Sequence, residues 1–480
     1  MRSKGGCGRR VVSATTGVVL GALMSGCGVT PPQNRVAAVA SMAPGSWNDS
    51  RPARAGIDLA WIRRFGDSQL SALVNESMSR NLDLRVAAEQ VRRAEAVARL
   101  AGAARKPQLQ GQIAGSRTKQ RFTGFPIPIG STTSETYGAS LDIGWELDLW
   151  GRLRASQSAA VGDLQAQGFE FQAARTSLAA QIAKAWFALG EANDQIRLAQ
   201  VAIVVREKTA QSVRERFAEA LVEEGGLASQ LRLTESDLAT SRASLARWQA
   251  ERERALRQIE LLVGRYPSGR SLSMRGLPPA PPRPPAGLPS ELLLRRPDIL
   301  AAERRYAAAG KRREAARLAK YPSFSLTGAM GTSTDSLHEV LSSNFGVWSL
   351  AGGVVQPILA GGRLREEERI ARHDEQIALG QLQRTVLQGL GEVEQALIAE
   401  DYFAKREAAV AESAVLAGEA AEAAIQDFAD GAVDALMLLS AQDRKVQTAF
   451  QLAELRRLRL DNRVNLHLAL GGDFKVRGKQ

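Results

Sequence analysis

Hydrophobic and polar residues alternate strictly from Ser140 to Leu149, and the period then changes. Leucine, isoleucine and tryptophan fall on one face, whereas aspartate and glutamate fall on the other. A period of two predicts a strand with one apolar and one polar face. From Arg152 the sequence continues for roughly 65 residues without a proline and is rich in alanine, which predicts a helix of roughly 100 Å. We therefore expect a strand that leads directly into an unusually long helix.

The predicted helix after Arg152 carries apolar residues at alternating steps of four and three. This spacing is typical of a heptad seam that packs against other helices. The alanines in the seam would let neighbouring helices approach closely. The seam residues are Leu178, Ile182, Ala185, Leu189, Ala192, Ile196, Ala199 and Ile203.

The same order of elements occurs twice in the chain: helix, proline, strand, loop, strand, Gly-Arg-Leu, long helix, turn and return helix. Asp83–Pro107 and Asp298–Pro322 have equal lengths, and so do Gly151–Phe217 and Gly362–Phe428. Two alanine-rich helices that align by chance would not reproduce this order. We interpret the pattern as an internal duplication, with the loop of the first copy at Gly124–Thr133.

The duplication sets the predicted boundaries. They are a signal peptide at 1–26, a lipid-anchored extended tether at 27–56, a first repeat at 57–265, a Pro-rich linker at 266–296 and a second repeat at 297–475. In the first repeat we expect strands at about 107–122 and 137–150 and long helices at 152–219 and 227–264. In the second we expect strands at about 322–334 and 345–359 and long helices at 363–430 and 434–470.

The N-terminus has the features of a bacterial secretion signal. Arginines precede an apolar run, Val11–Leu23, which is too short to span a bilayer as a stable helix. The run ends in Leu-Met-Ser-Gly-Cys, which resembles a lipobox, so we expect the thiol of Cys27 to carry a lipid. Gly28 stands where the inner-membrane retention signal typically has aspartate, which implies sorting to the outer membrane. Cys7 leaves with the signal, so the mature chain can form no internal disulfide.

Four amphipathic strands in one chain are too few to close a membrane barrel. Bacterial outer-membrane barrels need at least about eight strands. An open sheet edge in lipid would leave its backbone groups without hydrogen-bond partners. If the strands span the membrane, several chains must pool them.

Four motifs resemble the outer-membrane efflux proteins, the family of TolC-like and OprM-like channels. They are Trp-Glu-Leu-Asp-Leu-Trp-Gly-Arg at 145–152, Ala-Lys-Ala-Trp-Phe-Ala-Leu at 183–189, Arg-Pro-Asp-Ile with Ala-Ala-Glu at 296–303, and Leu-Leu-Ser-Ala-Gln at 438–442. The resemblance covers about residues 57–475. It is nearest to the nodulation-type outer-membrane factor lipoproteins of resistance-nodulation-division (RND) drug exporters.

This resemblance implies a mainly α fold with a membrane β-barrel, assembled as a homotrimer. A twelve-stranded outer-membrane barrel would stand on a long periplasmic α-helical barrel. The function implied is a passive conduit for drugs or other small molecules, fed by an inner-membrane RND-type pump and a periplasmic adaptor protein. The duct of a type I protein secretion system is the alternative. The chain would be lipid-anchored in the cell outer membrane and extend into the periplasm.

The resemblance also suggests functional residues at the turns of the two helical hairpins. The candidate adaptor-contact turns are Glu223, Glu224, Gly225 and Gly226 in the first copy and Asp430, Gly431 and Ala432 in the second. Ser440 stands where the family often has an acidic gate residue, and Asp443 lies one helical turn further on. We expect Ser440 and Asp443 to line the periplasmic gate. The alternative is that Asp443 pairs with Arg444 or Lys445 on the outside.

Two other groups of residues invite a functional interpretation. Trp145 and Trp150 stand at a predicted strand end, where an interfacial aromatic belt is a better interpretation than a ligand site. A basic cluster fits a solvated helix face or a position near phospholipid headgroups better than a nucleic-acid site, because the protein is exported. Its members are Arg304, Arg305, Lys311, Arg312 and Arg313. Removal of the signal, which has four basic residues and no acidic one, lowers the formal net charge from +12 to +8, and an excess of that size does not by itself indicate nucleic acid.

No sequence motif points to catalysis, a metal site or a cofactor. His338, His373 and His467 are widely scattered. His373 and Asp374 fit a solvated or lumen-facing pair better than a catalytic one. Outside transport, the alternatives are a secreted hydrolase and a structural periplasmic coiled-coil lipoprotein. The absence of a nucleophile–base motif disfavours the first, and the amphipathic strands disfavour the second.

Overall fold

The structure, a computed structural model, describes residues 39–44, 47, 61–124, 127–220, 228–270, 272, 274, 276–284 and 289–472. These residues form two compact units, each assembled from segments that are far apart in the sequence. Unit 1 contains Glu95–Asp163 and Ala307–Gln376, and unit 2 contains the other described residues.

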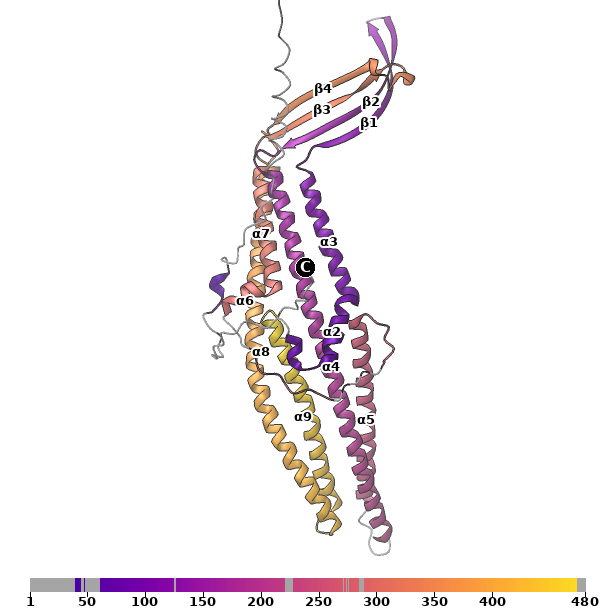
Figure 1. Cartoon of the computed structure of the whole chain (residues 1–480), viewed down its shortest axis with the longest axis vertical. Coiled ribbons are helices and arrows are strands. Elements are labelled where there is room, and N and C mark those ends of the chain that lie inside the picture. The colour runs from indigo at the N-terminus through magenta and orange to yellow at the C-terminus, as the bar shows by residue number, and fades with distance from the viewer. Residues whose placement is uncertain are drawn as a thin grey trace, which may run out of the picture. The chain divides into compact units, whose positions relative to one another are not determined.

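The elements follow one another in two similar series (Figure 1). The helices are α2 (Ser68–Arg80), α3 (Leu82–Ala103), α4 (Arg152–Ala220), α5 (Ala228–Val263), α6 (Pro289–Arg295), α7 (Pro297–Leu318), α8 (Arg363–Ala429) and α9 (Ala435–Ala469). The strands are β1 (Gln108–Gly124), β2 (Ile127–Leu147), β3 (Ser323–Thr334) and β4 (Gly346–Val355). Short 3₁₀ helices are η2 (Ala40–Met42), η3 (Trp61–Phe65), η4 (Leu337–Glu339) and η5 (Ser343–Phe345). Thus α3-β1-β2-α4-α5 is repeated as α7-β3-β4-α8-α9.

Unit 1 contains an antiparallel sheet with the strand order β1-β2-β3-β4. Its register places apolar residues on a common face, since Leu141 of β2 lies opposite Met330 of β3, which lies opposite Trp348 of β4. Polar residues alternate with them and point to the other face. The apolar side chains are exposed in the single chain, by 67% for Leu109 and 81% for Trp348. The sheet therefore presents an apolar face that the described part of the chain does not cover.

The strands differ from their predicted extents. Residues 127–133, which the sequence analysis assigned to a loop, continue β2 and pair with β1, so that Gly130 lies opposite Phe122. Strand β2 ends at Leu147 and not near 150, because the next residues turn into α4. Strand β4 ends at Val355 and not near 359, before Pro357, whose missing N–H cannot join a sheet ladder.

The two copies make corresponding hydrogen bonds where strands lead into long helices. In the first copy, Nε1 of Trp145 donates to the carbonyl oxygen of Arg105 at 2.9 Å. In the second, Nε2 of Gln356 donates to the carbonyl oxygen of Lys320 at 3.1 Å. Glycines with positive φ stand directly before both helices. They are Gly151 at 82° and Gly362 at 84°.

The return helices also end alike. Nδ2 of Asn81, before α3, donates to the carbonyl of Leu262 at 2.8 Å. Nη1 of Arg296, before α7, donates to the carbonyl of Ala469 at 3.4 Å. Both accepting residues lie two positions before a glycine that ends the return helix with positive φ, Gly264 or Gly471. A Cβ at either glycine would press on the backbone of the segment before α3 or α7.

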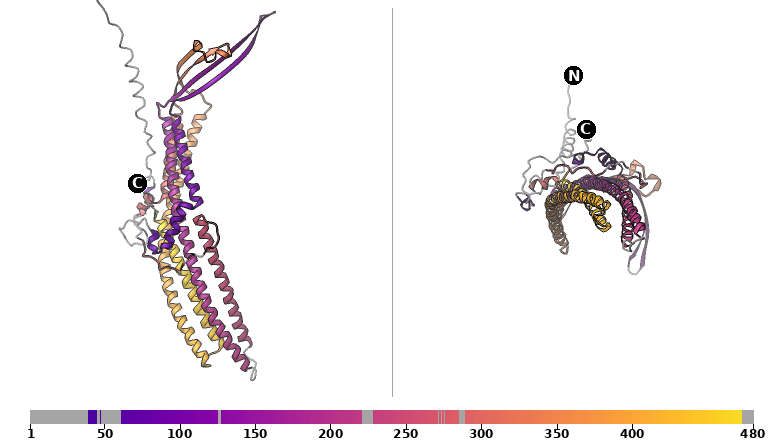
Figure 2. Two further views of the ribbon diagram at one scale, coloured as in Figure 1. Left: turned by 45° about the vertical axis from the view of Figure 1, so that its right-hand side comes forward. Right: turned by 90° about the horizontal axis from the view of Figure 1, so that it is seen from below.

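The long helices α4 and α8 contain 69 and 67 residues. At 1.5 Å per residue, each is roughly 100 Å long. Within unit 2, the long helices lie on an arc when they are seen along their axes (Figure 2). Among the described residues, no helix is both long enough and apolar enough to cross a membrane.

Unit 2 buries two main apolar clusters. One lies on α4 with α2 and α5 and includes Trp186, Phe187 and Leu256. The other joins α6 and α8 to the end of α9 and includes Leu293 and Leu382. The packing of large side chains in both clusters stabilises the helical body by burial of apolar area.

Part of the N-terminal segment belongs to this second cluster. Val39 and Trp47 have exposed fractions of 0% and 5% and pack among its residues. The interpretation of 27–56 as an extended tether is therefore wrong for these positions, because large apolar side chains there find a buried site. Cys27 and the signal peptide lie outside the described residues.

The linker between the copies is hydrogen-bonded to two carboxylates of the helices. Glu260 of α5 accepts hydrogen bonds from the hydroxyl of Ser268 at 2.9 Å and the N–H of Gly269 at 2.7 Å. Asp194 of α4 accepts from the N–H of Leu277 at 3.1 Å. The described part of the linker thus lies bound along unit 2.

Candidate functional site

The motif at 145–152 builds the junction between β2 and α4. Its alternating half ends at Leu147, and the carboxylate of Asp148 then accepts the N–H groups of Leu153 at 3.0 Å and Arg154 at 2.8 Å. These N–H groups lie in the first turn of α4 and have no partner within the helix. Glu146 accepts two hydrogen bonds from Nη2 of Arg152, at 2.7 and 2.9 Å. The motif therefore caps the long helix and fixes the junction that precedes it.

Both tryptophans of this motif also have structural partners. Nε1 of Trp150 donates to the carbonyl of Pro322 at 2.8 Å, and its ring lies 5.5 Å from that of Tyr321 between centroids. Trp145 bonds to Arg105 as described above. Both side chains thus lie at the end of the sheet. In each, the indole N–H already has a backbone carbonyl as its acceptor. Their assignment to a membrane-interface belt stays a prediction.

The turn of the second hairpin has a defined geometry. Gly431 has φ of 76°, and the N–H of Ala432 donates to the carbonyl of Asp427 at 2.8 Å, which closes the end of α8. The carboxylate of Asp434 then caps α9 by accepting the N–H of Met437 at 2.9 Å. Asp430 and Ala432 are exposed on this turn. The first-copy turn residues Glu223, Glu224, Gly225 and Gly226 lie outside the described residues.

The two hairpins are joined close to their ends. Nη2 of Arg216, from α4, donates to the carbonyl of Phe428 at the end of α8 at 2.5 Å. Its guanidinium carbon also lies 4.0 Å from the centre of the Phe428 ring, which adds a cation–π contact. A small apolar cluster surrounds this contact. Its buried members are Val213, Ala424, Phe428, Ala435 and Leu438.

The candidate gate residues lie on α9 in different environments. Ser440 is exposed, and its hydroxyl donates to the carbonyl of Met437 at 2.8 Å. Asp443 forms an ion pair with Arg206 of α4. The alternative pairing of Asp443 with Arg444 or Lys445 is wrong, because Arg206 takes that place and Lys445 pairs with a glutamate of α8. Arg206 lies 237 positions before Asp443, so the sequence around Asp443 does not indicate this partner.

Arg206 links three helices. Its side chain is 9% exposed, and its terminal nitrogens bond to the carbonyl of Asp237 at 2.9 Å, the hydroxyl of Ser241 and the carboxylate of Asp443. Burial raises the pKa of the Asp237 carboxyl, and the nearby Asp443 carboxylate raises it further, against the opposing effect of Arg206. One guanidinium therefore joins α4 to α5 and to α9 of the other hairpin.

The basic cluster on α7 is paired within the chain. Arg304 pairs with Glu303 at 2.6 Å and Arg313 with Glu375 at 2.8 Å. The remaining three members also have carboxylate partners: Arg305 with Glu170, Lys311 with Glu314, and Arg312 with Asp163. This pairing supports a structural role for the cluster.

The histidines do not form a site. His467 is buried and stacks on Trp61 with 5.4 Å between ring centres. His338 and His373 are exposed. In the part of the chain that the structure describes, no group of three His, Cys, Asp or Glu side chains could hold a metal ion.

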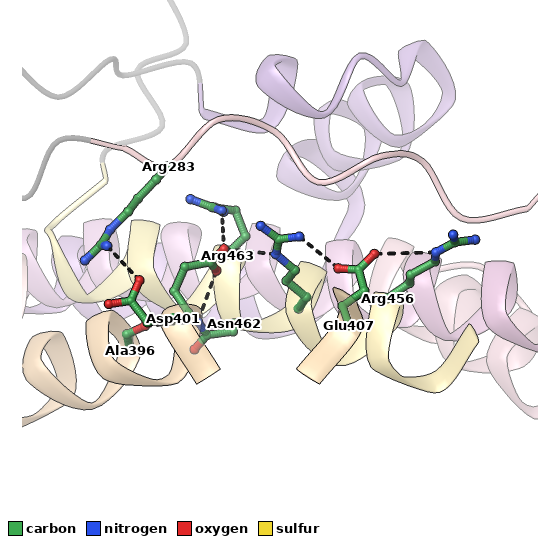
Figure 3. A network of polar contacts seen from close by, with 9 residues as sticks. Arg283, Ala396, Asp401, Glu407, Arg456, Asn462 and Arg463 are labelled. Carbon is green, nitrogen blue, oxygen red and sulfur yellow. Dashed lines mark hydrogen bonds and ion pairs between the residues drawn. The ribbon is translucent and has the colours of Figure 1, made fainter. Parts of the chain in front are cut away.

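The sequence analysis missed a buried ionic network between α8 and α9 (Figure 3). Glu400, whose side chain is 4% exposed, accepts Nε of Arg459 at 3.0 Å and Nη2 of Arg463 at 2.5 Å. Glu407 accepts from Arg459 at 2.8 Å. Burial lowers the pKa of Arg463, whereas the nearby carboxylate of Glu400 acts to raise it. The signal was available, since arginines at 456, 459 and 463 share one face of α9.

Comparison with known proteins agrees with this architecture. A family model described as "Outer membrane efflux protein" matches residues 73–265 and 288–472. The solved structure of the outer-membrane channel OprN superposes with a TM-score of 0.84 at 28% identity, over 93% of this chain and 100% of that one. The cation efflux system protein CusC of Escherichia coli O6:H1 is 28% identical over 421 residues, which cover 86% of this chain and 88% of the relative. Outer membrane protein OprJ of Pseudomonas aeruginosa is 28% identical over 483 residues, or 97% of each chain.

Duplicated helical hairpins and an amphipathic sheet are thus the architecture that this chain shares with a solved outer-membrane channel. The chain belongs to the outer membrane efflux protein family. It is an outer-membrane efflux protein and not an enzyme, so the alternatives of a secreted hydrolase and of a purely structural periplasmic lipoprotein are wrong.

Proposed function

We propose that this protein is the outer-membrane duct of a tripartite efflux system. A periplasmic adaptor and an inner-membrane pump of the RND type would deliver substrate to its helical end. The observation that carries the proposal is the antiparallel sheet of unit 1, whose apolar face is exposed. Such a face suits contact with lipid, and the polar face opposite suits a water-filled lumen.

The sheet also supports a homotrimer. Its outer strands, β1 and β4, each have one edge without a partner strand in the described chain. Lipid does not tolerate such edges, and three copies of four strands would give a closed barrel of twelve. We expect native mass spectrometry in detergent to show three copies. A stable monomer that conducts ions would contradict the pooled barrel.

The substrate class is broad in this proposal. Relatives are named for the efflux of cations, of pyoverdine, and of toluene or other solvents. These relatives share one architecture but export chemically different substrates. We infer that the pump selects the substrate and that the outer-membrane channel does not. We therefore propose drugs or other small molecules as cargo.

We place the gate at the hairpin ends. The Arg206–Asp443 pair and the contact of Arg216 with Phe428 join the two hairpins there. An adaptor that contacts the turns at Asp430–Ala432 and at 223–226 could separate the hairpins without disturbing the sheet. Ser440 and Asp443 would then line the opening.

Conductance of the purified protein in planar bilayers tests the proposal. We expect low conductance at rest and a higher one when the link between the hairpins is broken. Cells that lack the protein should accumulate a fluorescent pump substrate, and the wild-type chain should restore its export. An assembled trimer that conducts in neither state and does not restore export would contradict the proposed function.

A further inference from the structure

Strands β1 and β2 continue beyond the four-stranded part of the sheet in unit 1 (Figure 1). They contain 17 and 21 residues, whereas β3 and β4 contain 12 and 10. Strand β3 pairs with β2 only from Tyr137 onward, where Tyr137 lies opposite Thr334. A tilted transmembrane strand needs about 9–11 residues, so β3 and β4 have about this length and β1 and β2 exceed it. The β1–β2 hairpin therefore projects past the sheet at the end opposite to the start of α4.

Side-chain contacts show which face of this hairpin continues the apolar face of the sheet. Tyr137 shares a face with Leu141, because the two lie an even number of positions apart on β2. The Tyr137 ring covers Gly115 of β1, where a Cβ would come within 2.9 Å of it. The Tyr137 hydroxyl donates to Glu135 at 3.2 Å, and Glu135 pairs with Nε of Arg117 at 3.0 Å. Arg117 thus lies on the face that carries Leu141.

Arg117 is the first of three cations on this face of β1. Lys119 and Arg121 follow at intervals of two residues, and the first irregularity in the pairing with β2 comes after them. Neighbouring members are about 7 Å apart along the strand. Thr133 and Ser131 lie opposite Lys119 and Arg121, so their hydroxyl groups share the face. We call Arg117, Lys119 and Arg121 the basic ladder.

Two members of the basic ladder have no counter-charge. Arg117 pairs with Glu135, but no carboxylate among the described residues pairs with Lys119 or Arg121. Both of these side chains are exposed. The basic cluster on α7 differs, because each of its members has a carboxylate partner. The hairpin therefore presents two positive charges that the described part of the chain does not neutralise.

The order of side chains along this face matches a boundary between membrane and water. From the start of α4 outward, the face of β2 carries Trp145, then Ile143 and Leu141, and then Tyr137. Trp145 and Tyr137 enclose a stretch about as long as a transmembrane strand. Tryptophan and tyrosine gather at membrane interfaces, so the basic ladder directly beyond Tyr137 would lie at the level of the lipid headgroups. This placement rests on the proposed function, in which the sheet crosses the outer membrane and the hairpin end faces outward.

We propose that the basic ladder binds the phosphate groups of a lipid whose headgroup is a phosphorylated sugar, the lipid A class of the outer leaflet. A phosphate between Lys119 and Arg121 can accept from both cations and from the hydroxyl of Thr133. The acyl chains of the same molecule would cover Leu109 and Ile113, which lie on the same face and are 67% and 78% exposed. One lipid would then contact both the charged and the apolar part of β1.

Other partners match this face less well. An anionic cargo in the lumen would meet the opposite, polar face of the strands. The headgroup of a zwitterionic phospholipid would bring an ammonium group close to two cations. Free phosphate would match the charge but leave the adjacent apolar face uncovered. The combination of an apolar band with unneutralised cations directly beyond it therefore favours an anionic lipid.

Native mass spectrometry of the assembled, detergent-solubilised protein tests the site. The probes are diphosphoryl lipid A and the same lipid with both phosphates removed. We expect the wild type to bind the phosphorylated probe about tenfold more tightly. The double variant Lys119→Gln with Arg121→Gln should weaken this probe about tenfold and leave the phosphate-free probe unchanged. Inorganic phosphate at the concentration of the lipid should not displace it.

Two further double variants are the controls. Lys119→Arg with Arg121→Lys exchanges the two cations and should keep the affinity, because both charges remain. Arg85→Gln with Arg93→Gln removes two exposed cations from α3 and should leave lipid binding unchanged, although it changes the net charge equally. Size-exclusion elution and conductance in planar bilayers show whether each variant assembles into a channel.

The outcomes separate this inference from the proposed function. A wild type that conducts but binds both lipid probes equally would overturn the inference and leave the proposed function intact. Unchanged lipid binding by the Lys119→Gln, Arg121→Gln variant would do the same. Displacement by an equal concentration of inorganic phosphate would overturn the lipid assignment in favour of a soluble anion. A wild type that neither assembles nor conducts would contradict the proposed function, and the inference would fail with it.

Discussion

Asp461 shows how a single buried carboxylate affects stability. It pairs with Nη1 of Arg457 at 2.5 Å, but its Oδ1 is buried without a hydrogen-bond partner. Burial raises its pKa from 3.8 to about 6, although Arg457 and Lys184 act in the opposite direction. A raised carboxyl pKa means that protonation stabilises the folded state. This contribution is fully present below about pH 3.8 and is lost as the pH rises through about 6.

We therefore predict that Asp461→Asn is more stable than the wild type at pH 8, and that the difference shrinks on acidification to pH 4. A pKa change of about two units corresponds to about 3 kcal/mol between these limits. Thermal midpoints in detergent across this pH range measure the effect. Glu419→Gln, at an exposed position of α8, is the control. If the difference in thermal midpoint between Asp461→Asn and the wild type does not vary with pH, the prediction is wrong.

The Arg206–Asp443 pair gives a second prediction at the residue scale. Because Asp443 is 40% exposed, we expect the pair to contribute only about 1 kcal/mol, or roughly fivefold in the ratio of open to closed channels. Arg206→Gln and Asp443→Asn should each raise the open probability in planar bilayers. The double variant should open no more than the more open single variant, since both remove the same contact.

The same two variants test whether Asp443 also lines the pore. Three copies of its carboxylate near the axis would bind multivalent cations. In that case Asp443→Asn should weaken block by such cations, whereas Arg206→Gln should preserve it. If multivalent cations block both variants equally, Asp443 forms no acidic ring, and its pair with Arg206 serves only to link the hairpins.

At the scale of the element, the start of α4 depends on one side chain. Asp148 accepts two N–H groups of the first helical turn, whereas the corresponding position in the second copy is Leu359. We predict that Asp148→Ala lowers stability by about 1 kcal/mol, as the loss of a helix cap does. Asp148→Asn keeps one acceptor and should recover part of the loss. Thermal melts of the assembled protein compare the two, and equal midpoints for wild type and Asp148→Ala would refute the capping role.

The sequence predicted the helices better than the strands. A heptad seam in α4 and the absence of proline from both α4 and α8 define these helices locally, so their positions follow from the pattern. Residues 127–133 contain a proline and a glycine and look like a loop, yet β1 pairs with all of them except Ile129, at an irregularity in the register. Pairing between strands is a non-local effect that overrides local propensity.

The candidate site was predictable only in part. The turn at Asp430–Ala432 was visible from its glycine, because a positive φ favours that residue. Arg206 was not identified, because its partner Asp443 lies on another helix far along the chain. The arginines that bind Glu400 share one face of α9, and this pattern was visible in the sequence but was not used. Trp47 was hidden in a segment whose composition resembles a linker.

At the scale of the whole molecule, the protein has two independent means of attachment to the membrane in our proposal. The sheet would hold it in the bilayer, and the lipid on Cys27 would anchor the N-terminus. We predict that Cys27→Ala impairs processing and anchoring but still yields a foldable channel. Mass spectrometry of the mature wild type should find a lipidated cysteine as its first residue. An unmodified thiol, or a different first residue, would refute the anchor.

Strands β1 and β4 each have one edge without a partner strand among the described residues, and this matters for cells that make several related ducts. Hydrogen bonds along a strand edge involve only the backbone. Such an edge can therefore pair with the edge strand of any similar chain. A cell with a second family member could therefore form mixed trimers. In the proposed trimer, discrimination between self and relative would then come from side chains outside the ladder, chiefly those on the long-helix faces that contact the next subunit. Sequence divergence between coexisting ducts should then be concentrated on those helical faces and not in the strands.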